Sequence, residues 1–284
     1  MHRHDLLTGR LCPSFSTLLG DGMTQSNGLH RVIILSAGQG RRLLPYTESS
    51  PKCLIELGGK TVIEWQIDAL RARGFDDINV VAGYGIDQVE HLLEQRYGQG
   101  SISIHYNPFF EVADNLASCW MARHLMDGEF LLLNGDTVFD LPVLDRLLKA
   151  PARPITLAID HKPGYDSDDM KVCLDGDRLA RVGKNLPLDS VDGESIGMMR
   201  FQPEGALLFR CALEASMRTP EALQRWYLSI IDHLAQTTGQ VFVHSIAGLS
   251  WGELDFPHDL EAATLKVRSW SRPATGVYDK PFQP

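Results

Sequence analysis

At 284 residues the chain is long enough to bury the core of one large domain or of two small lobes. Its 27 basic and 36 acidic side chains give a formal net charge of −9, which argues against a general nucleic-acid-binding surface. The apolar fraction of 44% is ordinary for a globular protein. No apolar run approaches the ~20 residues of a membrane span, which excludes a transmembrane helix.

The first half of the chain predicts strands that alternate with helices. Continuous apolar runs predict strands buried on both faces, and apolar residues at helical spacing predict amphipathic helices. We expect strands at residues 31–38, 77–85, 101–107 and 129–136, and helices at 61–74 and 86–98. This order favours an α/β fold, with a Rossmann-like, mixed and mostly parallel sheet that has helices on both faces. Ligands bind beyond the carboxyl ends of such strands, where residues 38–42 and 134–136 fall.

The second half of the chain has shorter, polar-interrupted strands. The turn signal Asp-Gly-Asp at residues 175–177 separates two of them. We expect strands at residues 154–162, 170–176, 178–185, 195–201 and 240–247, and helices at 204–217, 220–237 and 257–269. Residues 29–270 therefore read as a single domain. We expect a nucleotide-binding half at 29–128 and a half at 129–270 that includes a small β-rich acceptor-binding part.

The terminal segments and the cysteines favour a cytoplasmic protein. Residues 1–28 lack the sustained apolar stretch of a signal peptide, so we expect a flexible extension or a native start at Met23. The proline-rich segment 271–284 is expected to be a loose tail. The cysteines, none of them spaced as C-x-x-C, predict buried free thiols in a reducing cytoplasm rather than a zinc site or disulfides. They are Cys12, Cys53, Cys119, Cys173 and Cys211.

The turn after the first predicted strand combines two glycines with nearby cations. A P-loop is excluded because Leu54 stands where its first glycine is required, and a dinucleotide fingerprint starts at Gly38 and Gly40 but has Leu43 in place of its third glycine. Backbone N–H groups in such a turn can hold a phosphate chain, and nearby cations can neutralise its charge. The alternative is an ordinary turn with solvated arginines.

The longer stretch LSAGQGRRLLPYTESSPKCLIELGGKTVIEWQI, residues 35–67, resembles the signature of the sugar-nucleotidyltransferase superfamily. Ser36, Arg41 and Thr61 depart from that signature without removing a charged position. The resemblance implies that Arg42 contacts the β- and γ-phosphates of a nucleotide and that Lys52 lies near the attacked phosphorus, whereas Arg41 faces solvent. It also implies nucleotide contacts from Leu35, Ala37, Gly38, Gly40, Gly83, Asn115 and Ser118.

The resemblance continues at two acidic segments. LLLNGDTVFD, residues 131–140, is similar to the strand whose final aspartate binds Mg²⁺ in this superfamily, which implies that Asp136 is a metal ligand. SWGELDFPHDLEAA, residues 250–263, resembles the segment before the last helix. It makes Asp255 the second ligand, with Glu253 nearby, and places Asp259 in the first turn of that helix.

Residues 168–201 resemble the corresponding segment of bacterial cytidylyltransferases that activate phosphocholine or related phosphonates and inositol phosphates. Lys171 and Lys184 become candidates for the acceptor phosphate, and Glu194 for an acceptor or metal-linked contact. The alternative for each lysine is a solvated strand residue. Aromatic and acidic residues within 107–120 offer a nook for an ammonium group, although the aromatics fit a core equally well. These residues are Phe109, Phe110, Trp120, Glu111 and Asp114.

We therefore expect a Mg²⁺-dependent cytidylyltransferase with catalytic residues Lys52, Arg42, Asp136 and Asp255. An oxygen of a small phosphate or phosphonate acceptor attacks the α-phosphorus of CTP, and pyrophosphate leaves. A sugar-1-phosphate or inositol-phosphate nucleotidylyltransferase is the alternative within this class. A nicotinamide oxidoreductase would need the missing glycine, and a non-catalytic nucleotide sensor would usually have lost a carboxylate or the lysine. The expected partners are CTP and the acceptor, without nucleic acid or membrane, and a homodimer is left open.

Overall fold

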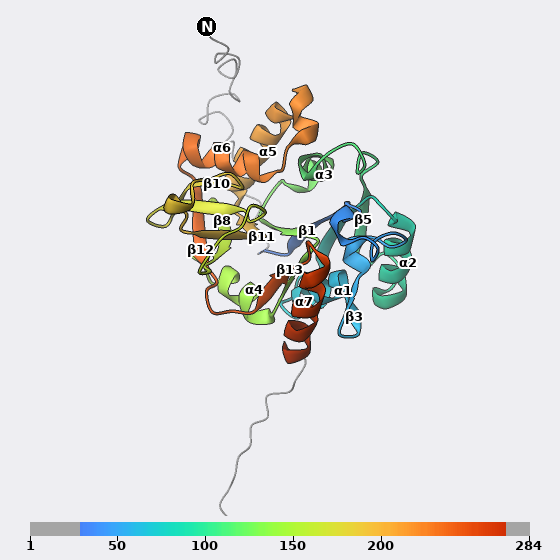
Figure 1. Ribbon diagram of the computed structural model, residues 1–284. Coiled ribbons are helices and arrows are strands. Elements are labelled where there is room, and N and C mark those ends of the chain that lie inside the picture. Colours follow the sequence, from blue (N-terminus) through green and yellow to red (C-terminus); the bar gives the residue numbers. More distant parts are fainter. Residues whose placement is uncertain (1–28, 271–284) are drawn as a thin grey trace, which may run out of the picture.

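The computed structural model describes residues 29–270 (Figure 1). The predicted extension at 1–28 and the predicted tail at 271–284 lie outside the described residues, as does Cys12. Among the described cysteines, Cys53 and Cys119 are buried as expected, whereas Cys173 and Cys211 are only partly buried. The helices are α1 (Val62–Arg71), α2 (Ile86–Tyr97), α3 (Asn115–Met121), α4 (Leu141–Leu148), α5 (Pro203–Ser216), α6 (Leu228–Thr238) and α7 (Pro257–Trp270).

A large mixed sheet forms the centre of the fold. Its strands are β1 (Arg31–Ser36), β4 (Asp77–Ala82), β5 (Ser103–Tyr106), β6 (Phe130–Asn134), β8 (Ile155–Asp160), β9 (Lys171–Asp175), β10 (Arg178–Gly183), β11 (Gly193–Phe201) and β12 (Val241–Ser245). They lie in the order β5-β4-β1-β6-β11-β8-β12-β10-β9. Pairing is parallel from β5 to β6 and between β8 and β12, and antiparallel at the other junctions. The predicted α/β fold with a mixed sheet is confirmed. The expectation that the sheet is mostly parallel is wrong, because antiparallel junctions are as frequent as parallel ones in this order.

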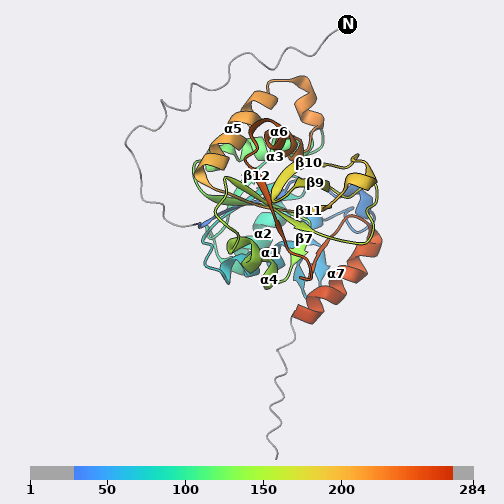
Figure 2. The ribbon, with the colours of Figure 1, turned by 90° about the vertical axis from the view of Figure 1, so that its left-hand side faces the viewer.

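The helices cover both faces of the sheet (Figure 2). One face carries α3, α5 and α6, and the other carries α1, α2 and α4. Alternate residues of β1 serve the two faces: Ile33 and Leu35 pack with the first set of helices, and Val32 and Ile34 with the second. This two-sided burial is the reason for the continuous apolar run that predicted the strand.

The second half of the sheet closes on itself. The start of β11 pairs with β9, whereas its end pairs with β6. As a result β11, β8, β12, β10 and β9 pair in a closed circuit. This circuit matches the small β-rich part expected from the short strands, although the division at residues 128 and 129 stays a prediction.

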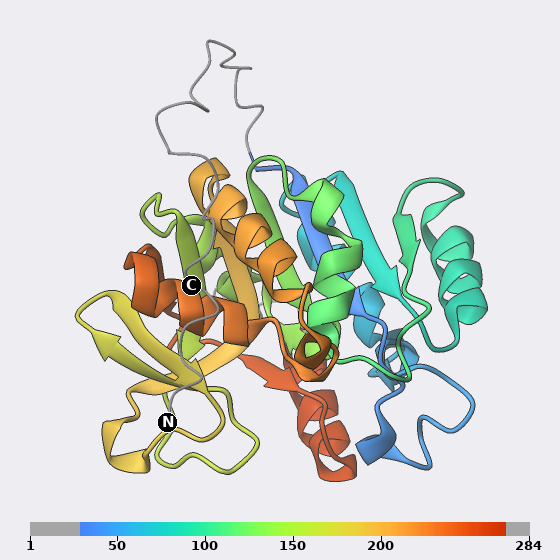
Figure 3. The same ribbon diagram turned by 90° about the horizontal axis from the view of Figure 1, so that it is seen from above.

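Two small sheets lie outside the large one. One pairs β2 (Glu56–Leu57) with β3 (Lys60–Thr61), and the other pairs β7 (Thr137–Phe139) with β13 (Trp251–Glu253). The second of these brings α7 to the end of the sheet at which the turn after β1 lies (Figure 3). Leu43 of that turn packs against Ala263 and Val267 of α7.

The helix expected at residues 220–237 is wrong as a single element. The chain forms a short 3₁₀ helix (Pro220–Gln224), runs extended at Arg225 and then enters α6. The backbone N–H of Tyr227 donates to Asn115 Oδ1 at 2.9 Å, and the N–H of Leu116 donates to the Arg225 carbonyl at 3.2 Å. Bonds to the start of α3 therefore replace the helical ones, and only tertiary contact could supply them.

Several short elements were not expected from the sequence: α3, α4, β7 and β13. Asp140, whose carboxylate accepts from the Leu141 N–H at 2.8 Å, and Pro142 are ordinary signals for the start of α4. The three-residue strands β7 and β13 carry no comparable signal because each exists through pairing with the other. Within residues 29–270, no helix has both the length and the apolarity needed to cross a bilayer.

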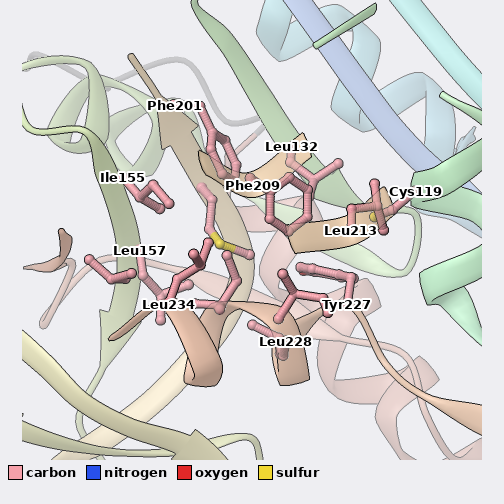
Figure 4. Close-up of a cluster of buried hydrophobic side chains, with 14 of the residues drawn as sticks. Cys119, Leu132, Ile155, Leu157, Phe201, Phe209, Leu213, Tyr227, Leu228 and Leu234 are labelled. Carbon is pink, nitrogen blue, oxygen red and sulfur yellow. The ribbon is translucent and has the colours of Figure 1, made fainter. Parts of the chain in front are cut away.

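Phe201 belongs to the cluster of buried side chains that α5 and α6 cover (Figure 4). Its ring stacks on Phe130 at a centroid distance of 4.5 Å and contacts Phe209 at 5.0 Å. We expect Phe201→Ala to lower the free energy of unfolding by about 3–5 kcal/mol, because the lost ring leaves a cavity. Urea unfolding measures this change. The exposed Leu188 serves as control, since Leu188→Ala should change stability by no more than about 0.5 kcal/mol. Equal stabilities of the two variants would contradict the packing described.

Candidate active site

Three parallel strands end side by side and bring together segments that are distant in the chain. In the sheet register Ser36 of β1 pairs with Ala82 of β4, and Leu35 pairs with Asn134 of β6. The turns that follow these strands therefore share one edge of the sheet. They contain residues 37–42, Gly83 and Asp136, so the edge carries most of the polar residues that the sequence predicts there.

Close backbone packing in these turns requires glycine at two positions. Gly40 has φ 75°, and a Cβ there would lie 3.0 Å from Lys52 Cβ. At Gly83 a Cβ would lie 2.6 Å from Phe110 Cβ and 2.7 Å from the Ala37 carbonyl oxygen. The glycine turn thus lies against the stem of the predicted catalytic lysine, and the backbone after β1 lies against the backbone after β4. Of the other predicted contacts here, Leu35 and Ala37 are buried.

The ammonium of Lys52 lies between two of the predicted carboxylates. Its Nζ donates to Asp136 Oδ2 at 2.8 Å and to Asp255 Oδ1 at 2.9 Å. Asp255 reaches this place because β13 pairs with β7, and the Leu254 N–H donates to the Asp136 carbonyl oxygen at 3.1 Å. Asp259 lies in the first turn of α7, as predicted. Its carboxylate accepts from the N–H of Asp255 at 2.9 Å and so holds the Asp255 backbone.

Burial and neighbouring charges shift the pKa of two members of this group. Burial alone would lower the pKa of Lys52, but the charges of Asp136 and Asp255 outweigh it and raise the pKa to about 12. Burial, followed by the charges of the same two aspartates, raises the pKa of Glu253 well above its ordinary value. The Lys52 ammonium by itself therefore compensates only part of the negative charge that these three neighbouring carboxyl groups can carry, and Arg42 is a second cation in contact with Asp255.

These carboxyl groups fit a hard divalent cation. One oxygen each from Asp136, Glu253 and Asp255 lies within 4.8 Å of the others. Asp136 Oδ1 is buried without a hydrogen-bond partner among the described residues, whereas its Oδ2 accepts from Lys52. An unpaired buried carboxylate oxygen is costly, and a cation such as Mg²⁺ or Mn²⁺ would satisfy it.

Arg42 links this cluster to the β-rich part of the molecule. Its guanidinium donates to Asp255 Oδ1 at 2.7 Å and also pairs with Asp168. Asp168 accepts in turn from Lys184 Nζ at 2.7 Å, and the Lys184 ammonium lies 4.6 Å from the ring centroid of Trp226. Burial alone would raise the pKa of Asp168, but Lys184 and Arg42 lower it. One carboxylate thus joins two cations to which the sequence analysis assigns different phosphates.

The other predicted acceptor residues, Lys171 and Glu194, lie deeper. Lys171 is 2% exposed, and its ammonium donates to the Lys184 carbonyl at 2.8 Å and to the Asp169 carbonyl at 3.4 Å. Glu194 pairs with Lys162 at 2.9 Å, and Lys162 also donates to Asp169 Oδ1 at 2.7 Å. Burial raises the pKa of Glu194 to about 7 although Lys162 opposes it. Lys171 therefore braces the backbone beneath Lys184, and Glu194 belongs to an internal ion pair.

Asn115 and Ser118 make internal hydrogen bonds. Asn115 Oδ1 accepts from the Tyr227 N–H at 2.9 Å, and Ser118 Oγ accepts from Asn107 Nδ2 at 3.0 Å. Both side chains hold α3 and its neighbours in place, and their predicted contact with the nucleotide stays a prediction.

A cavity of about 370 Å³ opens between the glycine turn and residues 110–114. Phe110, Glu111 and Asp114 line it, so this part of the predicted ammonium nook faces a cavity. Trp120 does not line the cavity: its ring packs against the core and carries the Arg123 guanidinium at 3.9 Å. For Trp120 the core alternative holds.

Two residues of this region were missed in the sequence. Asp168 is the first residue of the segment 168–201 that carries Lys171, so its position was visible but its partners were not. Trp226 fell inside a helix expected at 220–237, and nothing in the sequence indicated that the helix breaks there to expose the ring, which is 42% exposed.

Comparison with known proteins finds relatives that are named as enzymes. The chain is 28% identical over 247 residues to CMP-5'-(3-aminopropyl)phosphonate synthase of Streptomyces rubellomurinus, covering 83% of this chain but only 38% of that longer protein. It is 27% identical over 233 residues to 2-aminoethylphosphonate cytidylyltransferase of Lancefieldella rimae, covering 81% of this chain and 90% of the relative. These relatives support an enzyme of the cytidylyltransferase type.

The fold has a solved counterpart in the CTP:phosphocholine cytidylyltransferase LicC of Streptococcus pneumoniae. The two superpose with a TM-score of 0.69 at 20% identity, over 84% of this chain and 99% of LicC. The family model of the MobA-like NTP transferase domain matches residues 32–183, which is more than half of the 284 residues. The resemblance inferred from the signature at residues 35–67 is confirmed, and the chain belongs to the MobA-like NTP transferase family.

Proposed function

We propose that the chain transfers CMP from CTP to a small phosphate or phosphonate acceptor. An acceptor oxygen forms a bond to the α-phosphorus of CTP. The bond between the α-phosphorus and the oxygen that bridges the α- and β-phosphates breaks, and pyrophosphate leaves with that oxygen and its negative charge. The observation that carries this proposal is the Lys52 ammonium between Asp136 and Asp255, at the strand ends beside the glycine turn. Cation and carboxylates at one point are what phosphoryl transfer needs, because positioning and charge neutralisation provide most of its catalysis.

Each residue has a distinct task in this reaction. Backbone N–H groups of residues 38–40 and the exposed Arg42 guanidinium bind the triphosphate, and Lys52 neutralises charge at the reacting phosphates. Asp136 and Asp255, with Glu253 beside them, would hold Mg²⁺. When bound there, Mg²⁺ would supply Lewis-acid stabilisation of charge on the phosphate oxygens. No protein nucleophile is required.

For the acceptor we propose a small molecule with a phosphate or phosphonate at one end and an ammonium group at the other. The names of the Streptomyces, Lancefieldella and Streptococcus proteins each include a compound of this kind. In this chain Lys184 pairs with Asp168, and the acceptor phosphate can take the place of that carboxylate. The face of Trp226 and the carboxylate of Asp114 offer sites for an ammonium group.

We also propose a cytoplasmic location, which the buried thiols of Cys53 and Cys119 support because they suit a reducing compartment. The homodimer stays a prediction, and sedimentation velocity would measure the assembly.

The substrate pair is tested by kcat/KM. We expect CTP to be preferred over UTP, and phosphocholine or 2-aminoethylphosphonate to be preferred over inositol phosphate and glucose-1-phosphate, with pyrophosphate release as the readout. The ammonium group of phosphocholine or 2-aminoethylphosphonate can contact a carboxylate or a ring face. We therefore expect their kcat/KM to exceed that of the other two acceptors by about tenfold or more, equivalent to about 1.4 kcal/mol. Preference for a sugar phosphate with UTP would overturn the acceptor assignment and leave nucleotidyl transfer standing.

The two carboxylates are tested by removing one charge at a time. Asp136→Ala and Asp255→Ala should each lower kcat/KM at least about a hundredfold, because metal stabilisation of the transition state is worth several kcal/mol. Circular dichroism should show an unchanged fold. Asp145, which pairs with Arg73 on the surface, is the matched control, and Asp145→Ala should retain activity. Near-normal turnover in either active-site variant would refute the metal assignment.

Lys52 should act on the chemical step more than on binding. We expect Lys52→Ala to lower the single-turnover rate about a hundredfold and to weaken CTP binding less than about tenfold, because its charge matters most as pyrophosphate departs. Rapid-quench kinetics and equilibrium binding measure the two quantities. Lys149→Ala, at an exposed lysine after α4, should change neither. An unchanged rate together with collapsed affinity would make Lys52 only a binding residue.

A further inference from the structure

The turn that carries Asp136 is held by two buried polar side chains with no part in the chemistry described above. One is Gln66 on α1, and the other is Tyr227 at the start of α6. They are 1% and 0% exposed. They approach the turn from opposite faces of the sheet, since α1 and α6 lie on opposite sides (Figure 2).

Gln66 donates hydrogen bonds to the backbone on both sides of Asp136. Its Nε2 donates to the carbonyl oxygens of Asn134 and Thr137, each at 2.7 Å. Both amide protons are therefore used, and the two acceptors flank the Gly135–Asp136 pair. Gln66 Oε1 is buried without a partner among the described residues. An amide oxygen left unpaired costs about 1–3 kcal/mol, so burial by itself does not explain a glutamine at this position.

Tyr227 fixes the residue at the start of the same turn. Its hydroxyl donates to Asn134 Oδ1 at 2.9 Å. The other end of the Asn134 amide lies against Gly197, where an added Cβ would be 2.4 Å from Asn134 Nδ2. The Asn134 side chain is thereby locked between α6 and β11, and the backbone that leads to Asp136 is locked with it.

We propose that Gln66 and Tyr227 are positioning residues that aim the unpaired Oδ1 of Asp136 at the bound divalent cation. This inference rests on the proposed function, in which Asp136 is a metal ligand. The turn contains Gly135, which by itself allows many backbone conformations, and three hydrogen bonds from two helices select one of them. Outer partners of this kind typically change metal affinity by about 10–100-fold.

The test uses Mn²⁺ alone as the probe, with free Mn²⁺ measured by electron paramagnetic resonance during titration of the full chain. Tyr227→Phe removes one hydroxyl and keeps the ring, and Gln66→Met keeps the length of the side chain and removes its donors. We expect each to weaken Mn²⁺ binding at least about tenfold. In activity assays the Mg²⁺ concentration for half-maximal rate should rise in parallel while the KM for the acceptor stays unchanged.

Matched controls remove similar hydrogen bonds elsewhere. Tyr97→Phe deletes a hydroxyl that donates to Asp68 Oδ1 at 2.9 Å, and Gln236→Met deletes an amide that donates twice to Asp232. Both should bind Mn²⁺ as the wild type does.

The outcomes separate this inference from the proposed function. Mn²⁺ affinity within twofold of wild type in the folded Tyr227→Phe variant overturns the positioning role, provided that Asp136→Ala abolishes binding. Tyr227→Phe decides the question if Gln66→Met does not fold. A wild type that binds no Mn²⁺, or an Asp136→Ala variant that binds it normally, contradicts the metal site and the inference together.

Discussion

The ion pairs of Lys52 are the interaction on which the site depends. They join residues that lie 84 and 203 positions apart in the chain, so they form only when β6, the β7–β13 pair and the turn before α1 are all in place. Three carboxyl groups that share one place would repel one another, and the ammonium makes their approach tolerable. Loss of the ammonium would leave the Asp136 carboxylate without a cationic partner, and loss of both aspartates would leave a largely buried ammonium unpaired, and either change would be costly.

The sheet explains why these groups meet at that point. Parallel strands β4, β1 and β6 carry their carboxyl ends to one edge, and each strand is followed by a turn that contains glycine. Apolar packing on both faces of the sheet holds the strands in register. The apolar core therefore positions the polar turns, although its side chains take no part in the chemistry of the site. The closed circuit of β8 to β12 then places Asp168 and Lys184 opposite Arg42.

Most of the fold could be predicted, because its signals are local. Strands β1 and β6 are buried on both faces, which gives continuous apolar runs. Helices α1 and α2 are buried on one side, which gives apolar residues at helical spacing. Both patterns are visible in the sequence. The break before α6 could not be predicted, since the bonds that replace the helical ones come from α3. The strands β7 and β13 could not be predicted for the same reason. Three residues are too few to show an alternating pattern, and each strand forms only by pairing with the other.

The sequence alone was enough to predict which groups the candidate site contains: a glycine turn, Arg42, Lys52 and two aspartates in segments that resemble a nucleotidyltransferase signature. Residue type and spacing suffice for this because phosphate and metal chemistry needs particular groups. Tertiary structure decided which groups face which. It directs Lys171 to backbone carbonyls, packs Trp120 against the core, exposes Trp226 and places Gln66 and Tyr227 around the turn of Asp136. The physical reason is that side-chain direction depends on packing between elements far apart in the chain, which no local pattern encodes.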